Sequence, residues 1–261
     1  MKKDSLVIAG FALAMLAFSS PVNCMEYRVG GRTASEDFRR PEDAKLALAS
    51  CNGDVTAIAR AISIGANPNA IGATAGTPLF WALSCKSLPG MEALLKAGSS
   101  PNYQIPGDGD AFSPVFVAAG LEDPRMLQLL LKYGGDPSST GDSGHTSALE
   151  RAFGLGLQLS DGGLQSERLG WENYYLLLEA GADINQRGVS FSIAEVAASL
   201  NQFDKVSELL DRGYVLRLEN LRALIDSTRT EFTGINQGAW LLKVKAKLEG
   251  VGTASVSSMR R

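Results

Sequence analysis

A short segment recurs along this 261-residue chain and leaves few folds open to it. In four copies an apolar helical run ends at a Gly and a small polar turn follows, and a fifth copy repeats only the start of the segment. The copies read L-L-L-E-A-G-A-D-I-N at 176–185, A-I-S-I-G-A-N-P-N at 61–69, L-L-K-A-G-S-S-P-N at 94–102, L-L-K-Y-G-G-D-P-S at 130–138 and L-L-D-R-G at 209–213. Self-similarity at such spacings indicates an array of stacked units, because one unit cannot bury its own apolar face.

The spacing of small residues predicts two short helices in each unit. The turn glycines are separated by 33, 36, 47 and 32 residues. In four units an Ala in a helical pattern lies 16 residues before the Gly: Ala49, Ala82, Ala118 and Ala197. In the remaining unit Ala152 lies 29 residues before Gly181, so this unit carries 13 additional residues, within 154–170. An insertion of this length in a compact domain is usually functional or disordered.

The helix boundaries have matching signals. Thr77-Pro78-Leu79 and Ser113-Pro114-Val115 place a Thr or Ser at the N-cap and a Pro at the first helical position, where both residue types are favoured. The Gly after each second helix is expected in the left-handed conformation that ends a helix.

This pattern resembles the ankyrin repeat, which has a period near 33 and a T-P-L opening before two antiparallel helices. The resemblance covers about 43–213 and is closest in the second unit, whereas the first, fourth and fifth units lack T-P-L. It implies an all-α solenoid of about five helix-turn-helix units, near 43–70, 71–103, 104–139, 140–186 and 187–217. The alternative is a helical bundle of unrelated topology.

The two ends of the chain have different compositions. Residues 1–24 combine a basic start with an apolar run of about 13 residues and then small residues, which is typical of a secretory signal peptide. Residues 25–42 are expected to be a mobile lead-in with a short helix over 35–40. Residues 218–250 are expected to form C-terminal cap helices, and residues 251–261 a frayed tail. We therefore expect an exported, periplasmic protein, with a lipoprotein acylated at Cys24 as the alternative.

Composition argues against several classes of function. Residues 1–24 contain two Lys and one Asp, so the 25 basic and 28 acidic residues of the chain become 23 and 27 without them. A net charge near −4 does not favour nucleic acid as a partner. With one His, no Cys-x-x-Cys and no phosphate-binding Gly-rich motif, we expect no metal, no cofactor and no enzymatic activity.

Two cysteines, Cys51 and Cys85, lie near the ends of the first helices of adjacent units. In an oxidising compartment they could form a disulfide. Neighbouring helices lie about 8–10 Å apart, whereas a disulfide needs Cα atoms within about 7 Å. Both a bridge and two separate thiols remain open.

If the resemblance holds, function lies in a concave surface formed by the turn tips and first helices. Aligned positions predict a set of partner-binding residues: Tyr103, Ile105, Asp108, Asp110, Leu121, Glu122, Asp142, His145, Leu155, Arg187 and Phe191. Secreted ankyrin-like proteins of this size resemble immunity proteins that neutralise type VI secretion effectors, including phospholipases. The expected partner is thus another protein, a secreted toxin or a periplasmic enzyme, bound by a chain that is monomeric when free. The alternatives are an envelope adaptor for a resident enzyme such as a catalase, an enzyme, and a protein secreted onward into a host cell.

Overall fold

The protein is all-α, as expected from its sequence. The computed structural model describes residues 27–104, 112–141, 146–160, 171–186, 191–228 and 235–258. Within these ranges it contains 13 helices and one pair of two-residue strands, β1 (Thr140–Gly141) and β2 (Thr146–Ser147), which are antiparallel. The predicted signal peptide and Cys24 lie outside the described residues.

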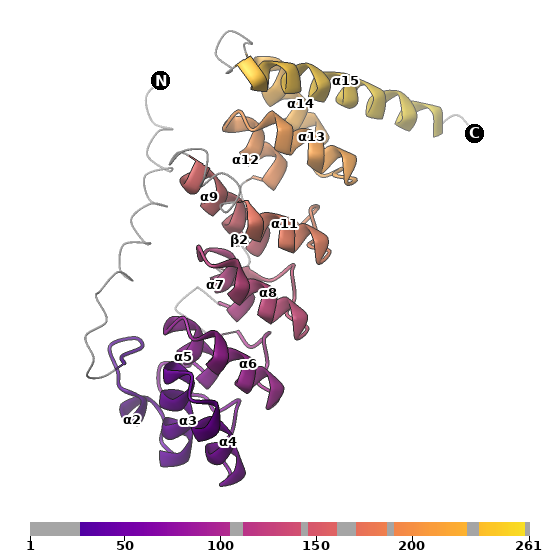
Figure 1. Ribbon diagram of the computed structural model, residues 1–261. Helices are drawn as coiled ribbons and strands as arrows, with labels where there is room; N and C mark the ends of the chain where they lie inside the picture. The colour runs from indigo at the N-terminus through magenta and orange to yellow at the C-terminus, as the bar shows by residue number, and fades with distance from the viewer. Residues whose placement is uncertain are drawn as a thin grey trace.

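Ten of the helices form five successive pairs, which Figure 1 shows stacked along one direction from indigo to orange. The first helices lie on one side of the stack and most second helices on the other. The pairs are α3 (Pro41–Asn52) with α4 (Val55–Ser63), α5 (Pro78–Ser84) with α6 (Leu88–Lys96), α7 (Pro114–Ala119) with α8 (Pro124–Lys132), α9 (Ala148–Ser160) with α11 (Glu172–Glu179), and α12 (Ile193–Ser199) with α13 (Phe203–Asp211).

The first helices begin in two ways. Ser113 accepts the Phe116 N–H (3.0 Å) and Pro114 is the first helical residue, whereas Thr77 precedes Pro78 without a side-chain cap bond. Where Pro is missing, as before α12, Ser192 caps the Glu195 N–H and the Glu195 carboxylate accepts the Ser192 N–H at 2.8 Å. A Ser-x-x-Glu pair therefore caps the start of α12, as the Ser113 hydroxyl caps α7.

The turn glycines close each unit as predicted. Gly65, Gly98, Gly134, Gly181 and Gly213 have φ between +82° and +97°, in the left-handed region that favours Gly.

An Asn after the Gly then joins its unit to the next one. The Asn102 Nδ2 amide donates to Gly134 O (2.9 Å), and the Asp136 N–H donates to Asn102 Oδ1 (2.7 Å). Asn69 and Asn185 make the same two bonds to the units that follow them.

The core runs through the array between the helices. One continuous apolar cluster extends from Leu46 in α3 to Leu248 in the last helix. Small residues on the first helices, such as Ala118 and Ala119, are fully buried, which lets neighbouring units approach closely. The large side chain of Trp81 on α5 is also fully buried, as the helical spacing of Leu79, Trp81 and Ala82 in the second unit predicts.

The segment expected to be a lead-in packs on the first two units. Its helix α2 (Ala34–Asp37) starts with a capping box of Thr33 and Glu36. Phe38 packs against Trp81, with ring centroids 6.1 Å apart, and the Asp37 carboxylate accepts the Trp81 indole N–H (2.9 Å). The sequence pattern contained no signal for these contacts, which join residues far apart in the chain.

In the fourth unit, half of the insertion continues a helix. α9 extends to Ser160, and residues 161–170 lie outside the described part. Leu155, predicted to be an exposed partner-binding residue, is instead buried, with 4% of its surface exposed. The prediction was wrong because α9 continues past the usual helix end and turns this side chain into the core. Gly156 on the same helix lies against the Trp171 ring, where a Cβ would collide.

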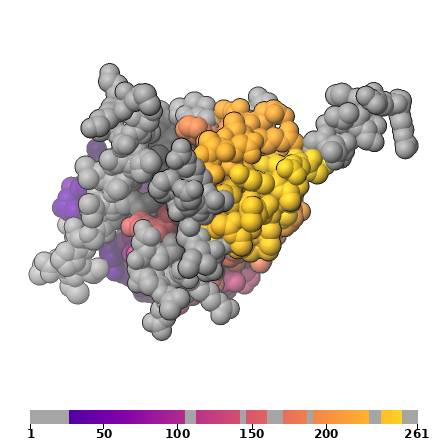
Figure 2. Space-filling model, turned by 90° about the horizontal axis from the view of Figure 1, so that it is seen from above, coloured from indigo at the N-terminus to yellow at the C-terminus, as the bar shows by residue number. Residues whose placement is uncertain are grey.

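Two further helices cover the C-terminal end, α14 (Leu218–Ser227) and α15 (Ile235–Ser258). Figure 2 looks down on this end and shows α15 in yellow beside the orange segment. Lys247 of α15 donates to Ser207 O (3.1 Å) and pairs with Asp211 Oδ2 (2.6 Å) on α13. The helix continues to Ser258, through residues expected to be a frayed tail. No helix in the described part of the chain is long and apolar enough to cross a membrane.

Candidate binding surface at the first helix pair

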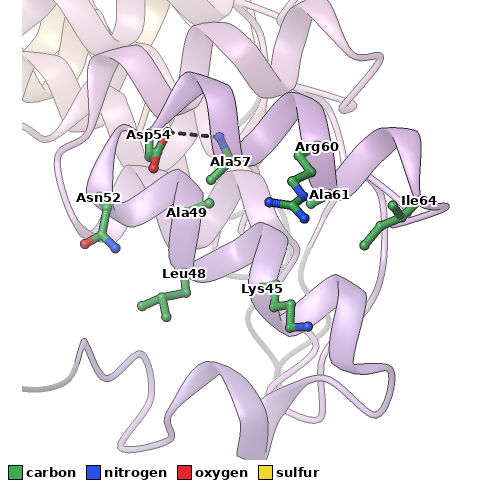
Figure 3. A pocket seen from close by; sticks show the side chains of 9 residues that line it. All are labelled: Lys45, Leu48, Ala49, Asn52, Asp54, Ala57, Arg60, Ala61 and Ile64. Carbon is green, nitrogen blue, oxygen red and sulfur yellow. Dashed lines mark hydrogen bonds between the residues drawn. The ribbon is translucent and has the colours of Figure 1, made fainter.

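A hollow of about 550 Å³ lies between α3 and α4, at the N-terminal end of the array. Figure 3 shows nine side chains around it: Lys45, Leu48, Ala49, Asn52, Asp54, Ala57, Arg60, Ala61 and Ile64. Alanines line much of the floor, while Leu48 and Ile64 are 42% and 60% exposed. The hollow thus combines small and large apolar groups with a polar rim.

The same face is buried in the second unit. Leu48 and Ala57 correspond, 33 residues later, to Trp81 and Gly90. Trp81 is fully buried, and a Cβ at Gly90 would collide with the carbonyl oxygen of Ser50 on α3. The hollow is therefore the first unit's copy of the face through which α5 and α6 pack on α3 and α4.

Later units fill this face with side chains that reach the preceding helix pair. Asn173 and Lys205 occupy the position of Ala57, eight residues before the turn Gly. The Asn173 Nδ2 amide donates to Leu121 O (2.7 Å), and the Lys205 ammonium donates to the Tyr175 hydroxyl (2.6 Å). At the first unit the corresponding Ala57 borders the hollow instead.

Lys205 shows how a charge is accommodated in such an interface. Its ammonium lies 4.6 Å from the centre of the Trp171 ring and 3.3 Å from Asp204 Oδ2. Burial alone would lower the pKa of the Lys205 ammonium, but the hydrogen bond to Tyr175 and the Asp204 charge outweigh it and raise the pKa. Lys205 therefore stays charged and stabilises the contact between the last two helix pairs.

The turn of the first unit has its own substitutes for the bridging Asn. The Arg40 guanidinium donates to Gly65 O (3.0 Å), and the Asp43 carboxylate accepts the Asn67 N–H (2.7 Å). In the second, third and fifth units an Asn of the preceding unit makes both bonds, whereas in the fourth unit the Ser138 hydroxyl accepts the Asp183 N–H (2.9 Å). The backbone groups of the first unit's turn therefore have hydrogen-bond partners. The apolar hollow between α3 and α4 is still exposed.

The rim of the hollow carries both signs of charge. Lys45 lies on α3 and Arg60 on the last turn of α4, and neither makes a salt bridge within the described residues. Asp54 starts α4, where its carboxylate accepts the Ala57 N–H (2.9 Å). One carboxylate is therefore engaged in helix capping, and two cations face outward in a protein whose net charge is −3.

The predicted partner-binding residues do not form one described surface. Phe191 is 58% exposed and Glu122 is exposed, as expected of contact residues. Tyr103 and Leu121 are half-buried against the core. The others lie outside the described residues: Ile105, Asp108, Asp110, Asp142, His145 and Arg187.

Cys51 and Cys85 form a disulfide with a Cα–Cα distance of 5.2 Å. The predicted obstacle, the spacing of helix axes, does not apply because Cys51 lies in the last turn of α3 and Cys85 just after α5. Both belong to the apolar cluster beneath the N-terminal segment, with Phe38 and Trp81. The bridge therefore ties the first two units together where the segment 27–38 packs.

Sequence reasoning did not identify the hollow as a site. Its signal was present in Leu48 and Ile64, two large apolar residues at positions that an end unit would be expected to make polar. The helical spacing of Leu46, Leu48, Ile58 and Ile62 favours core positions for all four, and for Leu48 this prediction is wrong, because 42% of its surface is exposed.

Among the described residues, no three His, Cys, Asp or Glu side chains gather closely enough to hold a metal ion. The expectations of no cofactor and no catalysis stay predictions. Comparison with models of known protein families finds no match. A search of curated proteins finds no relative.

Proposed function

We propose that this chain is a non-catalytic protein-binding scaffold built as an ankyrin-type solenoid. The five helix pairs, the left-handed Gly after each pair and the Asn bridges between units support the architecture. Stacked units of this kind present extended surfaces whose role depends on the side chains they carry. The observation that carries a binding role is the hollow of about 550 Å³ at the first unit, with Leu48 and Ile64 exposed.

The particular role we propose is that of a periplasmic immunity protein, which binds and neutralises a secreted antibacterial effector such as a phospholipase. The apolar, signal-like N-terminus and the Cys51–Cys85 disulfide both suit an oxidising compartment outside the cytoplasm. The disulfide that ties the first two units together limits their relative motion, which reduces the conformational entropy lost when this end binds an enzyme.

The test is a pull-down of the tagged mature protein from periplasmic extract, followed by mass spectrometry and by an activity assay of each bound enzyme. We expect a secreted lipase or another toxin that loses its activity in the complex. A resident enzyme that stays active in the complex would contradict the immunity role and support an envelope adaptor. Recovery of no specific protein would contradict the scaffold itself.

A further inference from the structure

We infer that the hollow on the first helix pair is the docking site for an amphipathic helix of a partner protein, with an apolar face and acidic flanks. This inference deepens the proposed function and rests on it only in supposing that the partner is a protein. It concerns one face of the array, lined by Lys45, Leu48, Arg60 and Ile64 among others.

The shape of the site favours a helix. The corresponding positions in the second unit pack against the helices α3 and α4, so this face has the form that accepts helices elsewhere in the same molecule. The floor includes Ala49, Ala57 and Ala61, whose short side chains let another backbone approach closely. Helix-in-groove binding places an apolar stripe, spaced at i, i+3, i+4 and i+7, into such a groove.

The hydrogen bonds of this end disfavour a further complete repeat unit as the occupant. An additional unit would be expected to bridge to Gly65 O and the Asn67 N–H through an Asn, as in the second, third and fifth units. Arg40 and Asp43 already occupy both groups. What remains to be covered is the surface between two helices, which suits a single helix.

The charges around the hollow indicate which charge the flanks of a docked helix should carry. Lys45 on α3 and Arg60 on α4 are exposed and line the hollow, whereas the Asp54 carboxylate already accepts a helix N–H. Carboxylates on the flanks of a docked helix would meet both cations, and lysines would be repelled by them. The same charges disfavour helix α15 of another copy of this chain as the occupant, because that helix carries Lys243, Lys245 and Lys247 against a single acidic residue, Glu249.

The inference can be tested with two designed peptides and the mature protein. Each peptide has about 18 residues, enough to form a helix, and the same Leu and Ala stripe. One carries Glu on both flanks and the other carries Lys. In low salt, fluorescence anisotropy of the labelled peptides should show the Glu peptide binding at least about tenfold more tightly than the Lys peptide.

Variants locate the site. Leu48→Glu and Ile64→Glu should each weaken binding of the Glu peptide by about tenfold or more, since each places a carboxylate beside the apolar stripe. Ile71→Glu is the matched control, because Ile71 is 61% exposed and does not line the hollow. All three positions are exposed, so the unfolding transitions of the variants should stay close to that of the parent.

A charge reversal gives a result that loss of folding cannot imitate. The double variant Lys45→Glu, Arg60→Glu should exchange the preference and bind the Lys peptide more tightly. Equal binding of the two peptides by the parent protein, or an unchanged preference in the double variant, would overturn the inference.

The experiments distinguish the docking-site inference from the proposed immunity function. If the Leu48→Glu and Ile64→Glu variants capture and inhibit the partner enzyme as the parent does, the result supports the scaffold role and contradicts this docking site. If no enzyme is captured but the Glu peptide binds with the expected preference, the docking site stands and the immunity role falls.

Discussion

Asn102 joins two units through a single exposed side chain. Its amide donates to Gly134 O and its carbonyl accepts the Asp136 N–H, at 2.9 and 2.7 Å. The repetition of these bonds at Asn69 and Asn185 explains why the chain returns to Asn at the end of a turn. The Asn holds the relative position of two turns that contribute little apolar surface.

We expect Asn102→Ala to lower the free energy of unfolding by about 1–2 kcal/mol, because two hydrogen bonds between units are lost. The measurement is urea denaturation followed by circular dichroism. Asn52→Ala, at an exposed Asn of α3, serves as the matched control and should change the value by less than about 0.5 kcal/mol. Equal effects of the two substitutions would show that the bridge contributes nothing.

Glu150 makes stability depend on pH. Burial raises the pKa of its carboxyl above the ordinary value of 4.5, against the opposing effect of its hydrogen bonds with Ser147. Because the pKa of Glu150 is raised in the folded state, this carboxyl contributes fully to the stability of the folded protein below about pH 4.5. The contribution is lost as pH rises through the folded-state pKa. Glu150→Gln cannot titrate, so the variant should gain stability relative to the parent between pH 4.5 and 7. A difference in unfolding free energy that stays constant over this range would contradict the assignment.

At the scale of elements, the disulfide links α3 to α5 across 34 residues. Reduction, or the double variant Cys51→Ser, Cys85→Ser, should lower the free energy of unfolding by about 3–4 kcal/mol, from the restored entropy of the unfolded loop. Denaturation with and without dithiothreitol measures this effect, and the double variant should not respond to the reductant. A parent protein equally stable in both conditions would show that the bridge does not contribute.

The packing of the segment 27–38 on the first two units involves one buried carboxylate, that of Asp37. Asp37 accepts hydrogen bonds from the Trp81 indole N–H and from the N–H and hydroxyl of Thr74, at 2.7–3.0 Å. Asp37→Ala leaves the buried indole N–H without this acceptor, so we expect a loss of about 2–4 kcal/mol and faster proteolysis within 27–40. Limited proteolysis tests this, with Asp226→Ala on the exposed side of α14 as control. Equal cleavage rates would mean that the segment is held by its apolar contacts alone.

Structural features that are determined by neighbouring residues could be predicted from the sequence, whereas features that depend on distant residues could not. The left-handed glycines and the Ser113-Pro114 start of α7 are read from adjacent residues, and the structure confirms both. The Ser192–Glu195 capping box is an equally local signal, since its two residues lie three positions apart in the sequence. The burial of Leu155 and the seating of Asp37 depend on contacts with distant residues, which a repeat pattern does not contain.

At the scale of the molecule, the array differs between its two ends. The C-terminal end is covered by α14 and α15, whereas the first helix pair keeps a hollow with exposed apolar residues. An end unit normally presents a polar outer face. Retaining Leu48 and Ile64 there has a cost in solubility that a binding role would explain. The polar substitutes Arg40 and Asp43 stabilise the turn of that unit without covering the hollow.

We propose that this chain neutralises an enzyme by binding it, and a titration of enzyme activity tests this proposal. The enzyme recovered with the mature protein is held at a fixed concentration well above the Kd, and the mature protein is added stepwise while turnover is measured. We expect a linear fall in activity that ends near zero at a fixed molar ratio. An enzyme that remains fully active when saturated with the protein would contradict it.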